Sequence, residues 1–315
     1  MMKIFNGFED LISIPNPVLT IGTFDGVHLG HQKILQQLNQ EAKKINGESV
    51  LFTFYPHPRM VLFPETHGLK LIQTQDEKLR KLERMGLQNI VVYPFTSEFA
   101  NISAADFVQH FLVDKLGVKK LVIGYDHQFG KNREGTLSFL QQISSRYKFE
   151  VVEIPAQEID EVNVSSTRIR KSIESGDIAT ANKYLGEPFE LEGIVVRGKQ
   201  LGRTIGYPTA NIQLGTDIKI IPRNGVYSVE VILGQNIIHK GMMNVGVRPT
   251  VSDEMIRSIE VNIFDFSEDI YDQTIIVRLL SHVRDEQKFN SIDELKNQLQ
   301  ADETYCRQHT SVTIQ

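Results

Sequence analysis

Residues 22–31 read Gly-Thr-Phe-Asp-Gly-Val-His-Leu-Gly-His, and this stretch decides the fold of the first half of the 315-residue chain. It follows the apolar run 17–21, which is typical of a short buried strand, and it precedes an amphipathic helical pattern from Gln32 onward. Glycines at a strand-to-helix turn let the backbone approach a ligand, and the free N–H groups of the first helical turn attract anions. We therefore expect an anion-binding site at this turn.

The two histidines of the turn, His28 and His31, are candidates for phosphate binding. An imidazole there can donate hydrogen bonds to phosphate oxygens and stabilise the charge that develops when a phosphoanhydride is cleaved. A pair of capping or surface histidines is one alternative, and a zinc site is another. The single cysteine, Cys306, and the lack of a third ligand at zinc-like spacing disfavour zinc.

The rest of the first half alternates between strand and helix patterns. We predict strands over residues 49–54, 89–93 and 120–123, and helices over residues 76–85 and 104–116. Such an alternation indicates a parallel sheet covered by helices on both faces, a Rossmann-like α/β domain. In open α/β sheets, ligands bind at the carboxyl edge of the strands.

Three further segments carry polar groups to that edge. His57 and Arg59 follow the second strand, and a loop over residues 124–135 contains glycines and basic residues. Residues 165–170 read Ser-Ser-Thr-Arg-Ile-Arg and lead into a helix. The hydroxyls could serve only as helix caps, or together with the arginines they could cradle phosphate.

These four segments occur in the order found in bacterial bifunctional riboflavin kinase/FAD synthetases, whose N-terminal half is an FMN adenylyltransferase of the nucleotidyltransferase superfamily. The chain resembles that family. The resemblance implies an ATP-binding and phosphate-binding set of Gly22, Phe24, Asp25, His28, His31, Asp126, Ser166, Thr167 and Arg168. It implies that His28 and His31 act in catalysis and that Arg168 stabilises the departing pyrophosphate. The loop departs from the family pattern at His127 and Gln128, where phenylalanine and arginine are usual.

The pattern changes near Gly186, and we place a domain boundary there, giving domains 1–185 and 186–315. Short alternating runs without intervening helices indicate a small β-barrel or sandwich. We predict its strands over residues 190–196, 225–233, 236–243, 258–264 and 273–282. A helix over residues 291–299 should pack on it.

Residues 198–211 carry the chemistry of this half. They contain Gly-Lys-Gln-Leu-Gly-Arg but lack the Gly-Lys-Ser/Thr ending of a P-loop, and we expect no helix to follow. The side chains of Thr209 and Asn211 share one side of an extended backbone, and their oxygens suit Mg²⁺. From the residues alone, a glycine-rich hairpin and a phosphate loop both remain open.

The segment Gly-Arg-Thr-x-Gly-Tyr-Pro-Thr-Ala-Asn is similar to the signature of the riboflavin kinase domain, an antiparallel barrel with a C-terminal helix. The resemblance implies that Thr209 and Asn211 bind Mg²⁺–ATP and that Glu260 is the general base. By its alternation alone, Glu260 would more often be a solvated strand residue. The implied set for ATP is Gly198, Lys199, Gly202, Arg203, Thr204, Thr209 and Asn211, and for flavin it is Arg248, Arg284 and Glu286. Asn262 and Asp272 depart from the family pattern.

The resemblance implies a two-step enzyme that phosphorylates riboflavin to FMN with ATP and then adenylylates FMN to FAD. A kinase with an inactive or differently selective first domain is an alternative, and a flavin or nucleotide sensor is another. The net charge of −5 argues against a nucleic-acid partner. No apolar run is long enough to span a membrane, no secretory signal is evident, and the lone cysteine suits a reducing compartment. We therefore expect a cytoplasmic protein.

Overall fold

The structure is a computed structural model that describes residues 1–63, 68–124, 127–155, 164–198, 201–234, 237–249 and 255–308. Its contacts divide the chain into two compact units, Met1–Ser166 and Thr167–Gln315. Helices α8 (Ser166–Ser175) and α9 (Ile178–Leu185), which the sequence assigns to the first domain, group with the second unit apart from Ser166. The boundary after residue 185 stays a prediction.

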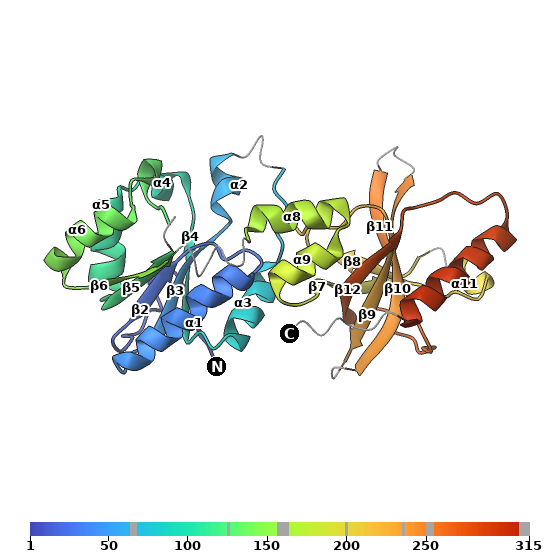
Figure 1. The fold of residues 1–315 in the computed structure, drawn as a ribbon, viewed down its shortest axis with the longest axis horizontal. Helices are drawn as coiled ribbons and strands as arrows, with labels where there is room; N and C mark the ends of the chain where they lie inside the picture. Colours follow the sequence, from blue (N-terminus) through green and yellow to red (C-terminus); the bar gives the residue numbers. More distant parts are fainter. Residues whose placement is uncertain are drawn as a thin grey trace. The chain divides into compact units, whose positions relative to one another are not determined.

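The first unit contains a six-stranded parallel sheet in the order β1-β4-β3-β2-β5-β6 (Figure 1). Its strands are β1 (Lys3–Asn6), β2 (Val18–Ile21), β3 (Ser49–Tyr55), β4 (Asn89–Pro94), β5 (Lys120–Gly124) and β6 (Glu150–Ile154). The predicted parallel α/β fold is confirmed. The two edge strands lie outside the predicted set, because β1 and β6 are short and only partly buried and so lack a continuous buried apolar run.

Helices and single turns connect these strands. They are α1 (Leu29–Lys44), α2 (Pro58–Leu62), α3 (Gln75–Arg84), α4 (Ser97–Ala100), α5 (Ala104–Asp106), the π-helix η1 (Phe107–Lys115), the 3₁₀ turn η2 (Lys131–Arg133) and α6 (Leu137–Tyr147). The predicted helix over residues 104–116 is therefore mostly a π-helix, a feature that a 3.6-residue period does not reveal.

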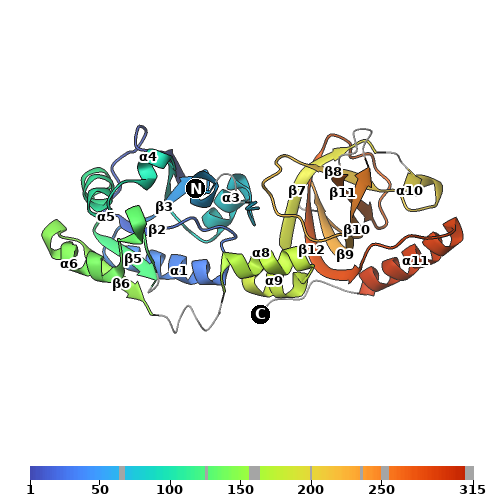
Figure 2. The ribbon, with the colours of Figure 1, turned by 90° about the horizontal axis from the view of Figure 1, so that it is seen from above.

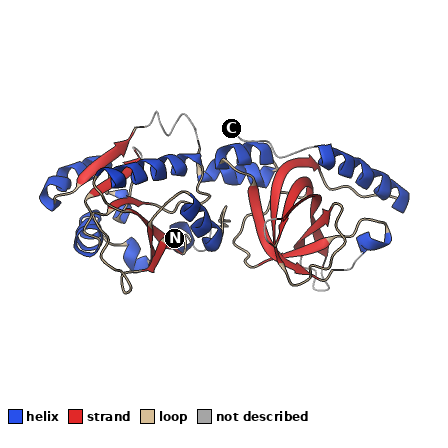
Figure 3. Ribbon diagram, turned by 90° about the horizontal axis from the view of Figure 1, so that it is seen from below, coloured by secondary structure: helices blue, strands red, loops and turns tan. Residues whose placement is uncertain are grey.

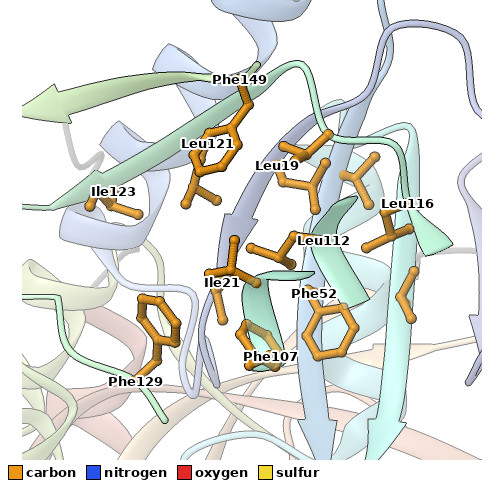
Figure 4. Close-up of a cluster of buried hydrophobic side chains, with 14 of the residues drawn as sticks. Leu19, Ile21, Phe52, Phe107, Leu112, Leu116, Leu121, Ile123, Phe129 and Phe149 are labelled. Atoms are coloured by element: carbon orange, nitrogen blue, oxygen red, sulfur yellow. The ribbon is translucent and has the colours of Figure 1, made fainter. Parts of the chain in front are cut away.

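The sheet buries apolar side chains on both faces, because successive residues of a strand point to opposite sides. On one face, strand residues Leu19, Ile21, Phe52, Leu121 and Ile123 pack with Phe107 and Leu112 of η1 and Leu140 of α6 (Figure 4). On the other face, strand residues Val18, Leu51, Ile90 and Val122 pack with Leu35 and Leu38 of α1 and Leu82 of α3. This packing fixes the turn between β2 and α1 at the carboxyl edge of the sheet.

The second unit contains a closed antiparallel barrel in the order β10-β11-β8-β7-β12-β9 (Figure 3). Its strands are β7 (Phe189–Val196), β8 (Ala210–Leu214), β9 (Gly225–Leu233), β10 (Ile237–Pro249), β11 (Met255–Ile263) and β12 (Thr274–Arg284). The predicted small barrel is confirmed. One strand, β8, was not predicted as such, although it carries Asn211.

Helix α9 packs against β7 and β12 of the barrel, and two further helices, α10 and α11, belong to this unit (Figure 2). The single turn α10 (Leu201–Thr204) lies within the glycine-rich segment 198–211, and the segment leads into strand β8 and not into a helix, as expected. The C-terminal helix α11 (Ile292–Gln308) is longer than predicted, and through Leu299 and Cys306 it packs on Val226 and Met242 of the barrel. No helix in the described part of the chain is both long and apolar enough to cross a membrane.

Candidate functional sites

The turn between β2 and α1 has an unusual backbone. Three of its residues have positive φ angles: Phe24 (52°), Gly26 (89°) and Val27 (38°). Glycine adopts this region readily, but phenylalanine and β-branched valine do so only under strain. Strain of this kind persists only where neighbouring groups hold the backbone, and it clusters at ligand-binding sites.

Asp25 and Ser166 hold this turn from two sides. The buried Asp25 carboxylate accepts hydrogen bonds from the backbone N–H of Ile72 at 3.0 and 3.2 Å and from that of Gln73 at 3.2 Å. The Ser166 hydroxyl donates to the Asp25 carbonyl oxygen at 2.9 Å. The Asp25 side chain is therefore engaged with the protein backbone, and Ser166 ties the start of α8 to the histidine turn.

Two buried lysines of α3 also hold the turn. Lys78 Nζ donates to the Thr23 carbonyl oxygen at 3.3 Å and to Thr53 Oγ1 at 3.4 Å, and Lys81 Nζ donates to the Gly26 carbonyl oxygen at 3.3 Å. Burial lowers the pKa of Lys78 to about 8, although the Asp25 carboxylate acts to raise it.

The sequence analysis missed both lysines, because α3 resembles a solvated charged helix. One signal was present. Lys78 and Lys81 share a helical face with Leu82 and Met85, at spacings typical of a buried stripe. Lysine on such a stripe needs a polar partner, and here the partners are backbone carbonyls.

The two histidine rings are stacked. Their centroids lie 3.6 Å apart with an interplanar angle of 17°, and Phe24 stacks on the other side of His31 at 4.5 Å. His28 is the N-cap of α1, and its Nδ1 accepts a hydrogen bond from the His31 backbone N–H at 3.3 Å. When neutral, His28 therefore carries its proton on Nε2, which makes that atom a hydrogen-bond donor.

His31 has a neutral ring at neutral pH. Burial, followed by the charges of His28, Lys81 and Lys78, holds its pKa well below the usual 6.5. Its Nδ1 is buried and has no hydrogen-bond partner among the residues that the structure describes. The turn thus presents polar ring atoms in a cationic surrounding, which suits an anionic ligand.

Of the other residues predicted for this site, Gly22 lies beside Phe24, whereas Thr167 and Arg168 belong to the second unit. Gly22 donates its N–H to the Phe52 carbonyl at 3.0 Å, and a Cβ there would lie 2.9 Å from the Phe24 ring. Arg168 lies in the second unit, where its guanidinium sits 5.3 Å from the centroid of the Tyr184 ring. Thr167 precedes it on α8. Asp126 lies outside the described residues. The first unit itself brings together six of the predicted residues: Gly22, Phe24, Asp25, His28, His31 and Ser166.

In the barrel, strand pairing brings three predicted residues together. Glu260 of β11 lies opposite Asn211 of β8 in the register, and Thr209 immediately precedes β8. Thr209 Oγ1 donates to Glu260 Oε2 at 3.2 Å. A Cβ at Gly198 would lie 2.2 Å from Asn211 Nδ2, so the glycine makes room for that amide. Hydroxyl, amide and carboxylate groups therefore gather at one place on the barrel.

A cavity of about 320 Å³ opens at this place. Five predicted residues line it: Gly202, Thr209, Glu260, Arg284 and Glu286. Apolar side chains form much of the remaining wall, and amides add polar groups: Ile205, Val226, Met242, Met243, Phe289, Leu295 and Leu299, with Asn244, Asn262 and Gln287. A cavity that combines apolar walls with polar groups is typical of a site for a small organic molecule.

A second cavity of about 450 Å³ lies next to the first, and Thr209 lines both. Arg203 and Tyr271 belong to its wall, but Glu260 does not. Thr204 is the last residue of α10. Lys199 and the side chain of Arg248, both predicted for the barrel site, lie outside the described part of the structure. Thr209 thus stands between two cavities, and only one of them contains the candidate base.

Arg284 forms an ion pair with Asp302, which is not among the residues predicted from the sequence. Its Nε lies 3.0 and 2.9 Å from the two oxygens of Asp302 on α11, and its Nη2 lies 2.8 Å from Oδ2. The Asp302 side chain is only 2% exposed. Glu286 accepts a hydrogen bond from Asn224 Nδ2 at 3.3 Å. Asp302 is sixteen residues beyond Glu286 on a polar helix, and nothing in its local pattern marks it.

Comparison with known proteins identifies relatives of both units. The FAD synthetase family profile matches residues 13–168, and the riboflavin kinase family profile matches residues 185–310. The bifunctional riboflavin kinase/FMN adenylyltransferase of Escherichia coli (strain K12) is 38% identical over 99% of each chain. The protein of that name from Haemophilus influenzae is 39% identical over 90% of this chain and 91% of its own.

A solved structure has the same architecture over nearly the whole chain. It is described as a macrolide-efflux protein from Streptococcus pneumoniae, and it matches with a TM-score of 0.89 and 36% sequence identity. The match covers 98% of this chain and 99% of that one.

Proposed function

Because this chain belongs to the bifunctional riboflavin kinase/FMN adenylyltransferase family, we propose that its barrel phosphorylates riboflavin and that its α/β unit adenylylates FMN. The enzyme uses ATP in both steps and produces FMN and then FAD. The contact between Thr209 and Glu260 at the junction of two cavities carries the kinase assignment. The stacked His28–His31 pair on a strained helix-capping turn carries the adenylyltransferase assignment.

In the kinase step, flavin occupies the cavity that contains Glu260, and the nucleotide occupies the neighbouring cavity that contains Arg203. The terminal ribityl hydroxyl of riboflavin attacks the γ-phosphorus of ATP, and ADP leaves. Glu260 takes the hydroxyl proton, which requires it to lie within hydrogen-bond reach of that oxygen. Arg203 and the backbone at Gly202 stabilise the phosphate charge. The apolar wall, with Met242 and Phe289, suits the flavin ring.

The oxygen donors of the barrel fit a magnesium ion. Thr209 supplies a hydroxyl and Asn211 an amide oxygen, and the Glu260 carboxylate lies beside both. Mg²⁺ prefers such hard ligands and usually takes only one or two from the protein, the remainder being phosphate and water. Among the described residues no cluster of three His, Cys, Asp or Glu side chains forms a dedicated metal site. We assign Thr209 and Asn211 as the residues that hold Mg²⁺–ATP, where the ion would neutralise phosphate charge.

In the adenylyl step, the phosphate of FMN attacks the α-phosphorus of ATP, and pyrophosphate leaves. No covalent intermediate with the protein is needed, so positioning and charge stabilisation carry the catalysis. His28 donates from Nε2 to a phosphate oxygen, and His31 stacks behind it and fixes its plane. From their place in the family motif we assign Thr167 and Arg168 to phosphate binding, and Arg168 to stabilising the leaving pyrophosphate.

The location and the domain boundary also belong to this proposal. Both reactions consume ATP and Cys306 is a buried free thiol, which together favour the cytoplasm. The start of the riboflavin kinase match at residue 185 supports a boundary near Gly186.

The purified chain should be incubated with riboflavin, ATP and Mg²⁺, and flavins should be separated by chromatography. We expect FMN to appear first and FAD afterwards, with one ADP released per FMN and one pyrophosphate per FAD. Recovery of unmodified riboflavin alone would reject the enzyme in favour of a flavin-binding protein. Formation of FMN without FAD would support the kinase function of the barrel and reject the adenylyltransferase function proposed for the first unit.

A further inference from the structure

The two buried ammonium groups of α3 lie directly beneath the histidine turn. Lys78 is 7% exposed and Lys81 is 1% exposed, and each donates to a carbonyl oxygen of residues 23–26. Burying an alkylammonium group is unfavourable unless it gains hydrogen bonds or a counter-charge. Two such groups on consecutive turns of one helix, both bonded to one short loop, therefore point to a function at that loop.

The contacts set the direction of the loop's peptide groups. In a trans peptide the carbonyl and the following N–H point in opposite directions. Since the Thr23 carbonyl faces Lys78 and Thr53, the Phe24 N–H faces away from α3. Likewise the Gly26 carbonyl faces Lys81, and the following Val27 N–H is directed to the Phe24 carbonyl at 3.2 Å. The two lysines thus hold the peptide groups that precede Phe24 and Val27, the two non-glycine residues of the turn with positive φ angles.

The positive charges of the same two ammonium groups also lower the pKa of His31. Burial lowers the pKa of His31 most. The charges of His28, at the start of α1, and of Lys81 and Lys78, on α3, lower it further. Asp25 is the acidic group near Lys78, and its carboxylate also binds the backbone of Ile72. His31 is therefore a neutral imidazole near the two ammonium groups of Lys78 and Lys81.

We propose that Lys78 and Lys81 are positioning residues for adenylyl transfer, which hold the turn in its nucleotide-binding conformation and supply positive charge beneath the ATP triphosphate. They do not touch the substrate. This inference rests on the adenylyltransferase function proposed above. It gives helix α3 a positioning role in the adenylyltransferase site. The charged sequence of this helix alone does not indicate that role.

The test uses Lys78→Met and Lys81→Met in the full-length chain, because methionine keeps the length and removes the charge. We expect the KM for ATP in FMN adenylylation to rise by about tenfold or more, with kcat less affected. Riboflavin phosphorylation, measured on the same preparation, should stay within about twofold. Arg84→Met removes an exposed cation from the same helix and should change neither activity.

The pH profile separates positioning from simple loss of structure. Removing the Lys81 charge allows His31 to take up a proton more readily, so the acidic limb of adenylylation should move to higher pH in Lys81→Met. The wild-type rate should fall above about pH 8, where Lys78 loses its charge, and Lys78→Met should lack this limb. Loss of charge on Lys78 does not reduce stability. The folded state binds fewer protons than the unfolded state between about pH 8 and the usual lysine pKa, so stability rises there.

Hydrogen exchange of the β2 and β3 amides establishes that each variant is folded. If a variant unfolds, the wild-type profile decides, since adenylylation must fall above about pH 8 while exchange protection persists. An unchanged KM and an unchanged pH profile in folded variants would overturn the inference. Absence of FAD formation in the wild type would instead reject the proposed function itself.

Discussion

His28 and His31 stack face to face with their ring centroids 3.6 Å apart, and the same pair is joined by a hydrogen bond from the His31 N–H to His28 Nδ1. Two protonated rings at that distance would repel each other strongly. At most one of the two rings therefore carries a positive charge, and the N-cap hydrogen bond to Nδ1 leaves the proton of a neutral His28 on Nε2. The side chain that caps α1 is thus also the one that we propose binds ATP phosphate.

The first prediction concerns stability in acid. The pKa of His31 is held well below 6.5 in the folded state, so the unfolded chain takes up a proton first as the pH falls. The first unit should lose free energy of unfolding as the pH falls from about 6.5 towards the folded pKa. His31→Asn should lack this dependence. Thermal denaturation of both proteins at pH 7.5 and 5.5 measures it, and equal shifts in Tm for the two would contradict it.

The second prediction concerns the proposed base. Glu260→Gln keeps the size of the side chain and the contact to Thr209 but cannot accept the hydroxyl proton. FMN formation should fall by about 10² to 10⁴, with the KM for riboflavin little changed. FMN-to-FAD conversion should persist. Glu192→Gln, in a strand glutamate outside both cavities, is the control. A Glu260→Gln rate close to wild type would remove Glu260 from the mechanism.

The third prediction concerns the space around Asn211. Gly198→Ala would place a methyl group 2.2 Å from Asn211 Nδ2, so the amide must move. If Asn211 holds Mg²⁺–ATP, the KM for Mg²⁺–ATP in riboflavin phosphorylation should rise by about tenfold. Gly215→Ala meets nothing within 4 Å and is the matched control. Steady-state kinetics of FMN formation test both variants, and a similar KM in the two would argue against the assignment.

The fourth prediction concerns the support of Arg284. Asp302 is buried and bonds both Nε and Nη2 of that guanidinium, so Asp302→Ala leaves a largely buried charge without its partner. Loss of one partner of such a pair destabilises by about 3–5 kcal/mol. The barrel should unfold at a lower temperature, and the KM for riboflavin should rise. Asp293→Ala, on the exposed first turn of α11, should be neutral in both assays.

Much of the fold follows from local patterns. The four central strands of the sheet were predictable because parallel strands buried on both faces need continuous apolar runs, as in Val18–Ile21 and Ser49–Tyr55. The edge strands escaped because only part of each is buried. The π-helix Phe107–Lys115 escaped because its side chains still form an apolar face, and only its backbone hydrogen bonds distinguish it.

The sequence by itself determined the two architectures and the chemistry-bearing segments, because hydrophobic period and glycine-rich turns are local properties of the chain. Only the tertiary structure decided which groups support those segments. Lys78, Lys81 and Asp302 are remote in sequence from the turn or arginine that they bind, and charged residues on a helix are usually solvated. Their function depends on burial, and burial is set by which surfaces meet when the chain folds.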